Sequence, residues 1–89
     1  MPAIERIGDE NTGGGVVLST PHSLVSANNK LVSVDGSPVS GHGRGRHRSP
    51  VTSSGSGNVS INNIPVTRLG DPDTCGHTRA EGSPNVSVN

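Results

Sequence analysis

Apolar residues along this chain fall in short alternating runs, separated by stretches of glycine, proline, serine and asparagine. Within residues 59–66, apolar side chains alternate with polar ones on both sides of an Asn62-Asn63 pair. A period of two predicts strands with one buried face, and asparagine tolerates the positive φ of a tight turn. The pattern therefore predicts a pair of short β-strands joined by a turn.

This unit recurs along the chain. Residues 58–62 (Asn-Val-Ser-Ile-Asn) reappear 27 positions later as residues 85–89 (Asn-Val-Ser-Val-Asn), and the same step backwards reaches residues 31–35. At this offset the Asn62-Asn63 pair aligns with Asp35-Gly36, which is itself a strong hairpin signal. The offset predicts that Asp35-Gly36 is the equivalent hairpin turn.

A third copy is split between the two ends of the chain. Its arm begins at Pro2, and the alignment carries one extra residue before Ile7-Gly8-Asp9, which matches Leu69-Gly70-Asp71. The last copy breaks off at the end of the sequence, whereas the preceding copy continues into a second strand. We therefore expect the segment after Pro2 to supply this strand and to bring the two ends of the chain close together.

The repeated units predict the fold class. No segment has a convincing helical period, and glycine or proline interrupts most windows long enough to hold a helix. A single unit cannot bury its apolar face, so three units must pack around a common axis. We expect residues 1–89 to form one all-β domain, a small pseudo-three-fold structure of short strand pairs whose polar loops gather at one end.

The composition indicates that this small domain needs a staple. Its 89 residues include 13 glycines and 7 prolines but no Phe, Tyr or Trp, which usually supply the largest buried areas. Cys75 is the only cysteine, so an internal disulfide is excluded. The formal net charge is zero, which gives no general case for nucleic acid or an anionic membrane as partner. The four histidines indicate a metal ion as the staple.

The loops hold nearly all the soft metal ligands. The second loop contains His42 and His47, and the third contains Cys75 and His77. The first loop contains none, but His22 follows it in the longer segment that leads to the next strand pair. Zinc takes four tetrahedral ligands of this kind. At least one ligand from each loop gives His22, His42, His47 and Cys75, and a set with His77 in place of His22 is the alternative. Iron is the other possible metal, but zinc is favoured because nothing indicates a redox role.

Other candidate sites are weaker. Arg44, Arg46 and Arg48 alternate with glycine and histidine in a way that suits phosphate contact, but without aromatic stacking residues we interpret this segment as a solvated loop. The Gly13-Gly14-Gly15 run lacks the Lys-Ser/Thr pair of a phosphate loop. No serine lies in a nucleophile motif, and a closed four-ligand site has no open position for water activation. We therefore expect neither enzyme activity nor a small-molecule substrate.

One stretch of the chain carries a family resemblance. Pro65-Val66-Thr67-Arg68-Leu69-Gly70-Asp71 resembles the Pro-Ala-Ala-Arg-x-Gly-Asp stretch of the PAAR-repeat family. The Cys75-Gly76-His77 loop, the return through residues 82–86 and the Val-x-Val-Asn strand are also similar to that family. Two segments depart from it: residues 38–41 lack the arginine, and Gly13 occupies a place where many members carry a ligand.

The resemblance implies a cone-shaped protein with zinc near its apex and a broad base that caps a trimeric β-helical spike. Such spikes belong to contractile phage tails or type VI secretion systems, so the implied location is the tail or baseplate tip of a virion. In a type VI secretion system, the implied location is the cytoplasm until the tip is ejected. The host outer membrane is then contacted mechanically, with no nucleic acid involved. The competing hypothesis is a free-standing zinc-binding adaptor module with no role in penetration.

Overall fold

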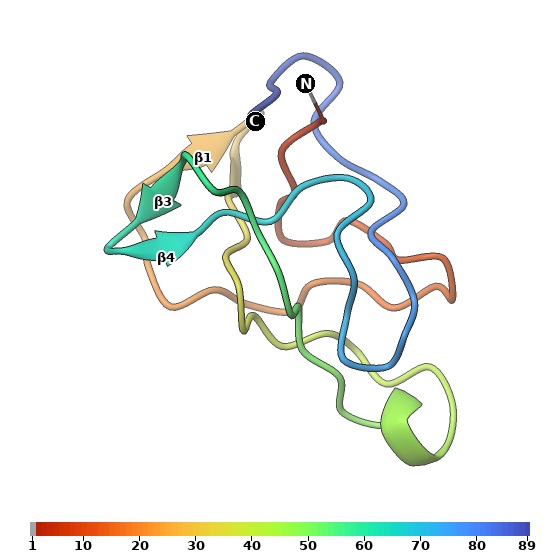
Figure 1. Cartoon of the computed structure of the whole chain (residues 1–89). Coiled ribbons are helices and arrows are strands. Elements are labelled where there is room, and N and C mark those ends of the chain that lie inside the picture. Colours follow the sequence, from red (N-terminus) through yellow and green to blue (C-terminus); the bar gives the residue numbers. More distant parts are fainter. Residues whose placement is uncertain (1) are drawn as a thin grey trace.

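Short antiparallel strands and isolated β-bridges make up this computed structural model, which describes residues 2–89 except the side chain of Arg46. Strand β1 (Ser26–Ala27) pairs with β2 (Lys30–Leu31), and β3 (Ser60–Ile61) pairs with β4 (Ile64–Pro65). The 3-10 turn η1 (Gly45–His47) is the one helical element of the described residues (Figure 1). This part of the chain contains no helix of the length and apolarity needed to cross a membrane.

Two of the three hairpins are closed by Asn-Asn turns. Asn28 and Asn29 join β1 to β2 with φ of 56° and 66°, and Asn62 and Asn63 join β3 to β4 with φ of 51° and 67°. Positive φ at both central residues is typical of a type I′ turn, whose twist matches that of the flanking strands. Asparagine reaches this left-handed region more readily than most residues. The turn predicted at Asn62-Asn63 is confirmed.

The third hairpin has no connecting turn, because its two strands come from the two ends of the chain. Ala3 forms an antiparallel bridge with Ser87, and the Ile4 amide donates to the Val86 carbonyl oxygen at 2.9 Å. The N- and C-termini consequently lie close together (Figure 1). The predicted completion of the last copy by the N-terminal segment is confirmed.

The pairing of this hairpin also fixes the alignment of the N-terminal arm. Ala3 takes the position that Pro65 takes in the β3–β4 hairpin. Residues 4–9 then align with residues 66–71 without an insertion, so the expectation of one extra residue in this arm is wrong. Pro2 and Pro65 are therefore not equivalent positions, although each begins a similar segment.

The offset between the β1–β2 and β3–β4 hairpins is 34 residues rather than 27. The Val66 amide donates to the Val59 carbonyl oxygen at 3.1 Å, and the equivalent bond runs from Val32 to Val25 at 3.0 Å. The unit that begins at Val59 therefore recurs at Val25, not at Val32 as predicted. Every strand shares the same period-two alternation, so this pattern does not distinguish the two registers.

Asp35-Gly36 forms a different turn from the one predicted. Gly36 has a φ of 84°, and the Ser37 amide donates to the Val34 carbonyl oxygen at 3.1 Å. The other two arms have an equivalent turn, with Gly8 and Gly70 each at a φ of 90°. Glycine with φ near +80° at the third position is typical of a type II turn. In all three arms this turn follows the second strand of the hairpin and leads into a ligand loop or its equivalent.

Three backbone hydrogen bonds form a closed ring around the pseudo-three-fold axis. The amide of Glu5 donates to the carbonyl oxygen of Thr67 at 3.1 Å, Thr67 donates to Ser33 at 2.9 Å, and Ser33 donates back to Glu5 at 2.9 Å. Each arm thus donates to one neighbour and accepts from the other, so the centre of the fold has no open strand edge. The predicted all-β, pseudo-three-fold fold class is confirmed.

The apolar core is one thin cluster of aliphatic side chains from the hairpins and from the strand segments beside the ring. Its buried members are Ile4, Ala27, Val32, Val34, Ile61, Val66 and Val88. Most of them are β-branched, which suits packing on short strands in a chain without aromatic residues. Outside this cluster the interior mixes a few buried apolar residues, such as Val17 and Val39, with buried charged ones, among them Glu5, Asp73 and Arg79.

Candidate metal centre

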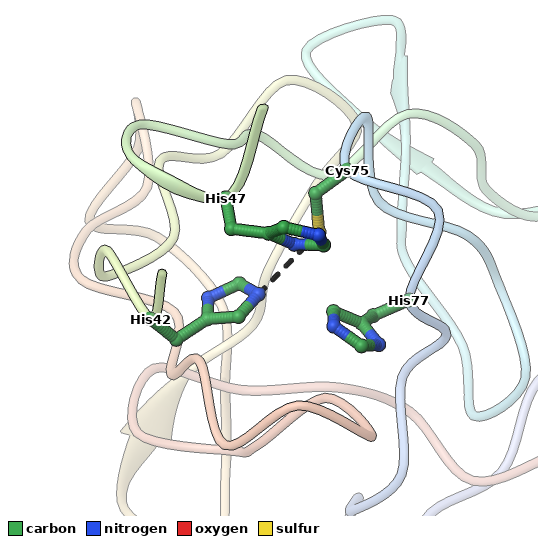
Figure 2. Close-up of side chains that lie close together, drawn as sticks. All are labelled: His42, His47, Cys75 and His77. Atoms are coloured by element: carbon green, nitrogen blue, oxygen red, sulfur yellow. Dashed lines mark hydrogen bonds between the residues drawn. The ribbon is translucent and has the colours of Figure 1, made fainter. Parts of the chain in front are cut away.

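Four ligand-type side chains converge at the loop end of the molecule. His42, His47, Cys75 and His77 point toward one another (Figure 2), and one ligand atom of each lies within 4.8 Å of the others. The three imidazole rings have centroids 4.9–5.2 Å apart, and His42 Nε2 lies 3.6 Å from Cys75 Sγ. Three imidazoles and one thiol therefore surround a single small volume.

The third loop places two of these ligands by a tight backbone turn. The Asp73 amide donates to the His77 carbonyl oxygen at 2.8 Å, and the Gly76 amide donates to the Asp73 carbonyl oxygen at 3.0 Å. Gly76 has a φ of 91°, a conformation that side chains disfavour. This loop brings Cys75 and His77 to the same side of the turn.

The second loop supplies the other two ligands from a longer excursion. The His42 amide donates to the His47 carbonyl oxygen at 2.9 Å, and His47 is the last residue of η1. His42 Nδ1 lies 3.0 Å from the Ser40 carbonyl oxygen. A carbonyl oxygen only accepts, so Nδ1 carries the hydrogen and the Nε2 lone pair is left to bind a metal.

The first loop contributes space rather than a ligand. It repeats the backbone of the third loop: the Asn11 amide donates to the Gly15 carbonyl oxygen at 2.8 Å, and Gly14 has a φ of 87°. Gly13 and Gly15 therefore occupy the positions of Cys75 and His77. A Cβ atom on Gly13 would lie 2.5 Å from the His77 ring, and one on Gly15 would lie 2.5 Å from the His42 ring. This differs from the expectation of at least one ligand from each loop.

His22 lies outside this group. Its Nε2 is 2.7 Å from the Val32 carbonyl oxygen, and its Nδ1 accepts a hydrogen bond from the Leu24 amide at 3.1 Å. Both ring nitrogens are therefore engaged by backbone groups, and His22 is buried as part of the first return. The structure brings together His42, His47 and Cys75 of the expected set, and His77, the alternative, stands in place of His22.

The four donors fit zinc. Zinc–nitrogen bonds of about 2.0–2.1 Å and a zinc–sulfur bond of about 2.3 Å give a tetrahedron with a nitrogen–sulfur edge of about 3.6 Å. The distance from His42 Nε2 to Cys75 Sγ is also 3.6 Å. His77 Nδ1 lies 3.0 Å from Thr12 Oγ1, so its ring has the outer hydrogen-bond partner common for metal-binding histidines. Four such donors would make a closed site, which is typical of structural metal ions.

The comparison with family models decides the identity of the fold. The model of the PAAR motif matches residues 7–89. This chain belongs to the PAAR-motif family. PAAR proteins are structural tips of phage-tail or type VI secretion spikes, not enzymes. The resemblance found in the sequence is confirmed, although no curated protein matches the chain.

The signature arginine and aspartate of the PAAR motif clamp the type II turn. The backbone amide and Nε of Arg68 donate to Asp71 Oδ2 at 2.8 and 3.1 Å, and its Nη2 donates to Oδ1 at 2.9 Å. Arg6 and Asp9 repeat this arrangement in the first arm, with the corresponding distances between 2.9 and 3.0 Å. These bidentate ion pairs hold each turn in a fixed geometry.

The second arm lacks this ion pair, because Val34 and Ser37 stand in the places of the arginine and the aspartate. The Val34 amide donates to Ser37 Oγ at 3.2 Å, so the hydroxyl replaces one carboxylate oxygen. The departure from the family pattern therefore lies at Val34, not at residues 38–41 where the sequence alignment placed it.

A buried polar network joins the first and third loops beneath the metal ligands. Arg79 Nη2 donates to the carbonyl oxygens of Asp9 and Gly15, both at 3.0 Å, and Nη1 lies 3.4 Å from Asp73 Oδ2. Asp73 Oδ2 also accepts from Asn11 Nδ2 at 2.8 Å. The network thereby fixes the loop that holds Cys75 and His77 against the loop that makes room for them. Sequence reasoning missed it, because nothing in the spacing of these residues marks them as neighbours.

Glu5 completes this network from the ring around the axis. Its Oε1 lies 3.7 Å from Arg79 Nε, and the whole residue is inaccessible to solvent. Desolvation by burial raises the pKa of Glu5 to about 9, even though the Arg79 charge opposes the shift. Glu5 is therefore protonated at neutral pH in the folded protein, and Asp73 is the carboxylate that pairs with Arg79.

Proposed function

We propose that this PAAR protein caps the blunt end of a trimeric β-helical spike with its hairpin end and leads penetration with its loop end. The observation that carries the proposal is the arrangement of three equivalent hairpins around one axis. A trimeric spike presents three equivalent strand ends at its terminus. A single chain with pseudo-three-fold symmetry can match that surface and cover its open strand edges.

Each hairpin presents an equivalent exposed valine. Val25, Val59 and Val86 have exposed fractions of 43%, 38% and 36%, although valine is usually buried. Their carbonyl oxygens accept hydrogen bonds from the amides of three residues in equivalent positions around the pseudo-three-fold axis, Val32, Val66 and Ile4. Three apolar positions with this symmetry support docking on an apolar three-fold surface, with one copy per spike.

At the other end, we propose that His42, His47, Cys75 and His77 hold a zinc ion, with iron as the alternative metal. A bound ion would tie the second loop to the third at their ligand residues, in addition to the hydrogen bonds that join residues 51–53 to residues 72–74. The four ligands would then resist splaying of the loops under a compressive load. The mechanism is mechanical, and the site residues act by fixing the shape of the tip.

The docking proposal is tested by native mass spectrometry of the metal-loaded protein mixed with purified trimeric spikes, one from a phage tail and one from a type VI secretion system. The expected result is one chain per trimer on one of the two, which also identifies the machine. The triple variant Val25→Asp, Val59→Asp and Val86→Asp should lose binding. Leu18→Asp, at another exposed apolar residue outside the hairpins, should retain it. A metal-loaded monomer that binds neither spike would support the adaptor alternative instead.

A further inference from the structure

The second ligand loop differs from the other two in length and in charge. The first and third loops close over five residues, at 11–15 and 73–77, whereas the second is closed by a bond from the Val39 amide to the Pro50 carbonyl oxygen at 2.9 Å. Residues 40–50 contain three of the seven basic residues of the chain and none of its seven acidic residues. The rest of the chain therefore has four basic against seven acidic residues, and the zero net charge conceals a segregation of +3 and −3.

The loop arginines differ from the other arginines in their surroundings. Arg6, Arg68 and Arg79 each form an ion pair with an aspartate. Arg44 and Arg48 flank η1 and are exposed, and among the described side chains neither of them forms an ion pair. Their charge is thus available to an external partner.

The loop lies at the end of the molecule opposite the hairpins. Figure 1 shows η1 at one extreme, with the hairpins and both termini at the other. His42 and His47, which belong to the metal centre, anchor the loop on both sides of Arg44. A tip that docks through its hairpins would therefore present this loop first to whatever the spike meets.

We propose that residues 43–48 form a phosphate-binding contact for the surface of an anionic lipid membrane, through the exposed side chains of Arg44 and Arg48. The inference rests on the proposed function for the orientation of the tip. Guanidinium groups bind phosphate oxygens in a bidentate manner, and both chain neighbours of Arg44, Gly43 and Gly45, lack side chains that could obstruct such a contact. Nucleic acid is a poorer match, because the chain has no aromatic residue on which a base could stack.

The contact should be electrostatic and transient rather than an insertion. Each basic residue near an anionic lipid surface strengthens binding about fivefold, so the two exposed arginines give about 30-fold. Salt screens this attraction within about 10 Å at 0.1 M, so the effect should fall steeply as the salt concentration rises. Such a contact would align the apex with the membrane before force is applied.

The test is co-sedimentation of the metal-loaded protein with vesicles of phosphatidylglycerol and phosphatidylcholine, against vesicles of phosphatidylcholine alone. The wild type should bind the anionic vesicles at least tenfold more tightly at 50 mM salt, and lose this preference at 500 mM. The Arg44→Gln/Arg48→Gln variant should bind about 30-fold more weakly. Lys30→Gln, which removes an exposed positive charge from the β1–β2 hairpin, is the control and should bind like the wild type.

Folding is controlled through the metal content and melting temperature of each variant. If the Arg44→Gln/Arg48→Gln variant loses metal, the single variants Arg44→Gln and Arg48→Gln should each still weaken binding about fivefold. Equal binding of wild type and variants to anionic vesicles would overturn the proposal, as would tighter binding to duplex DNA at equal phosphate concentration. Spike capping in the mixture described above is measured separately. A protein that caps spikes but ignores vesicles disproves only the loop contact, and the reverse result disproves only the capping.

Discussion

The first and third loops share a backbone and differ in what that backbone carries. Both close with an amide-to-carbonyl bond of 2.8 Å across five residues, and both place a glycine at a φ near 90°. The third loop carries Cys75 and His77, whereas the first carries Gly13 and Gly15. The comparison teaches that the pseudo-three-fold frame is a property of the backbone, while the candidate metal centre is asymmetric, because side chains of the second and third loops lie against the glycines of the first.

The largest expected effect comes from removing the ligands of the third loop. Cys75→Ser or His77→Ala should abolish stoichiometric metal binding and lower the melting temperature by about 20 °C or more, because metal binding in so small a domain contributes directly to folding. Chelation of the wild type should have a similar effect. Elemental mass spectrometry and thermal melting measure both quantities.

His22→Ala is the matched comparison for this prediction. Its ring is held by Val32 and Leu24 outside the cluster, so the variant should keep about one metal ion per chain despite some loss of stability. Metal loss on His22→Ala together with retention on His77→Ala would contradict the ligand set.

A smaller effect is expected from filling the space in the first loop. A Cβ atom on Gly13 would lie 2.5 Å from His77 Nε2, so Gly13→Ala must displace that ring. We expect a 10- to 100-fold loss of metal affinity, and a cost of about 1–3 kcal/mol in the free energy of unfolding, as for other overpacked sites. Competition with a chelator of known affinity measures the first quantity.

Gly57→Ala is the control for the added methyl group, because a Cβ atom there meets nothing within 4 Å and the residue has no positive φ. Unchanged metal affinity in Gly13→Ala would show that the first loop is not a steric part of the centre.

The smallest effect concerns Glu5, which the first arm places where the third arm has Thr67. Folded Glu5 keeps its proton up to a pKa of about 9, whereas the unfolded chain releases it near 4.5. The folded state therefore binds more protons between these values, so the stability of the wild type falls as the pH rises through this window. Glu5→Gln should remove this pH dependence. Between pH 5 and pH 8, the free energy of unfolding of the variant should therefore rise relative to that of the wild type by about 1 kcal/mol or more.

Urea unfolding at pH 5, 6.5 and 8 gives the required free energies. Glu10→Gln, which removes an exposed carboxyl group of the same arm, serves as the control. A Glu5→Gln variant that becomes less stable relative to the wild type as the pH rises would mean that the carboxylate is ionised and paired with Arg79 in the folded protein.

Much of the fold could be predicted from local pattern. The Asn62-Asn63 turn, the absence of helical periodicity and the completion of the last hairpin by the N-terminal segment all follow from short stretches of sequence. The repeat register did not, because Val25 and Val32 both lie in alternating segments. The choice between them depends on which backbone groups pair across the hairpin.

The candidate site was predictable in its chemistry and less so in its membership. Counting soft ligands in the loops of a chain with one cysteine indicated a centre of three histidines and one cysteine. Aligning residues 9–15 with residues 71–77 would have shown that Gly13 and Gly15 replace Cys75 and His77. That glycine makes room for a ligand from another loop is a three-dimensional relation, which no spacing along the chain expresses.

By itself, the sequence determined the β character, the threefold repetition, the PAAR family and the residue types at the loop end, because each depends on residues near one another in the chain. Only the tertiary structure decided that His77 joins the cluster while His22 does not, and that Glu5, Asp73 and Arg79 meet beneath it. The reason is physical. These choices depend on distances between loops that are set by a ring of hydrogen bonds closing through space among Glu5, Ser33 and Thr67.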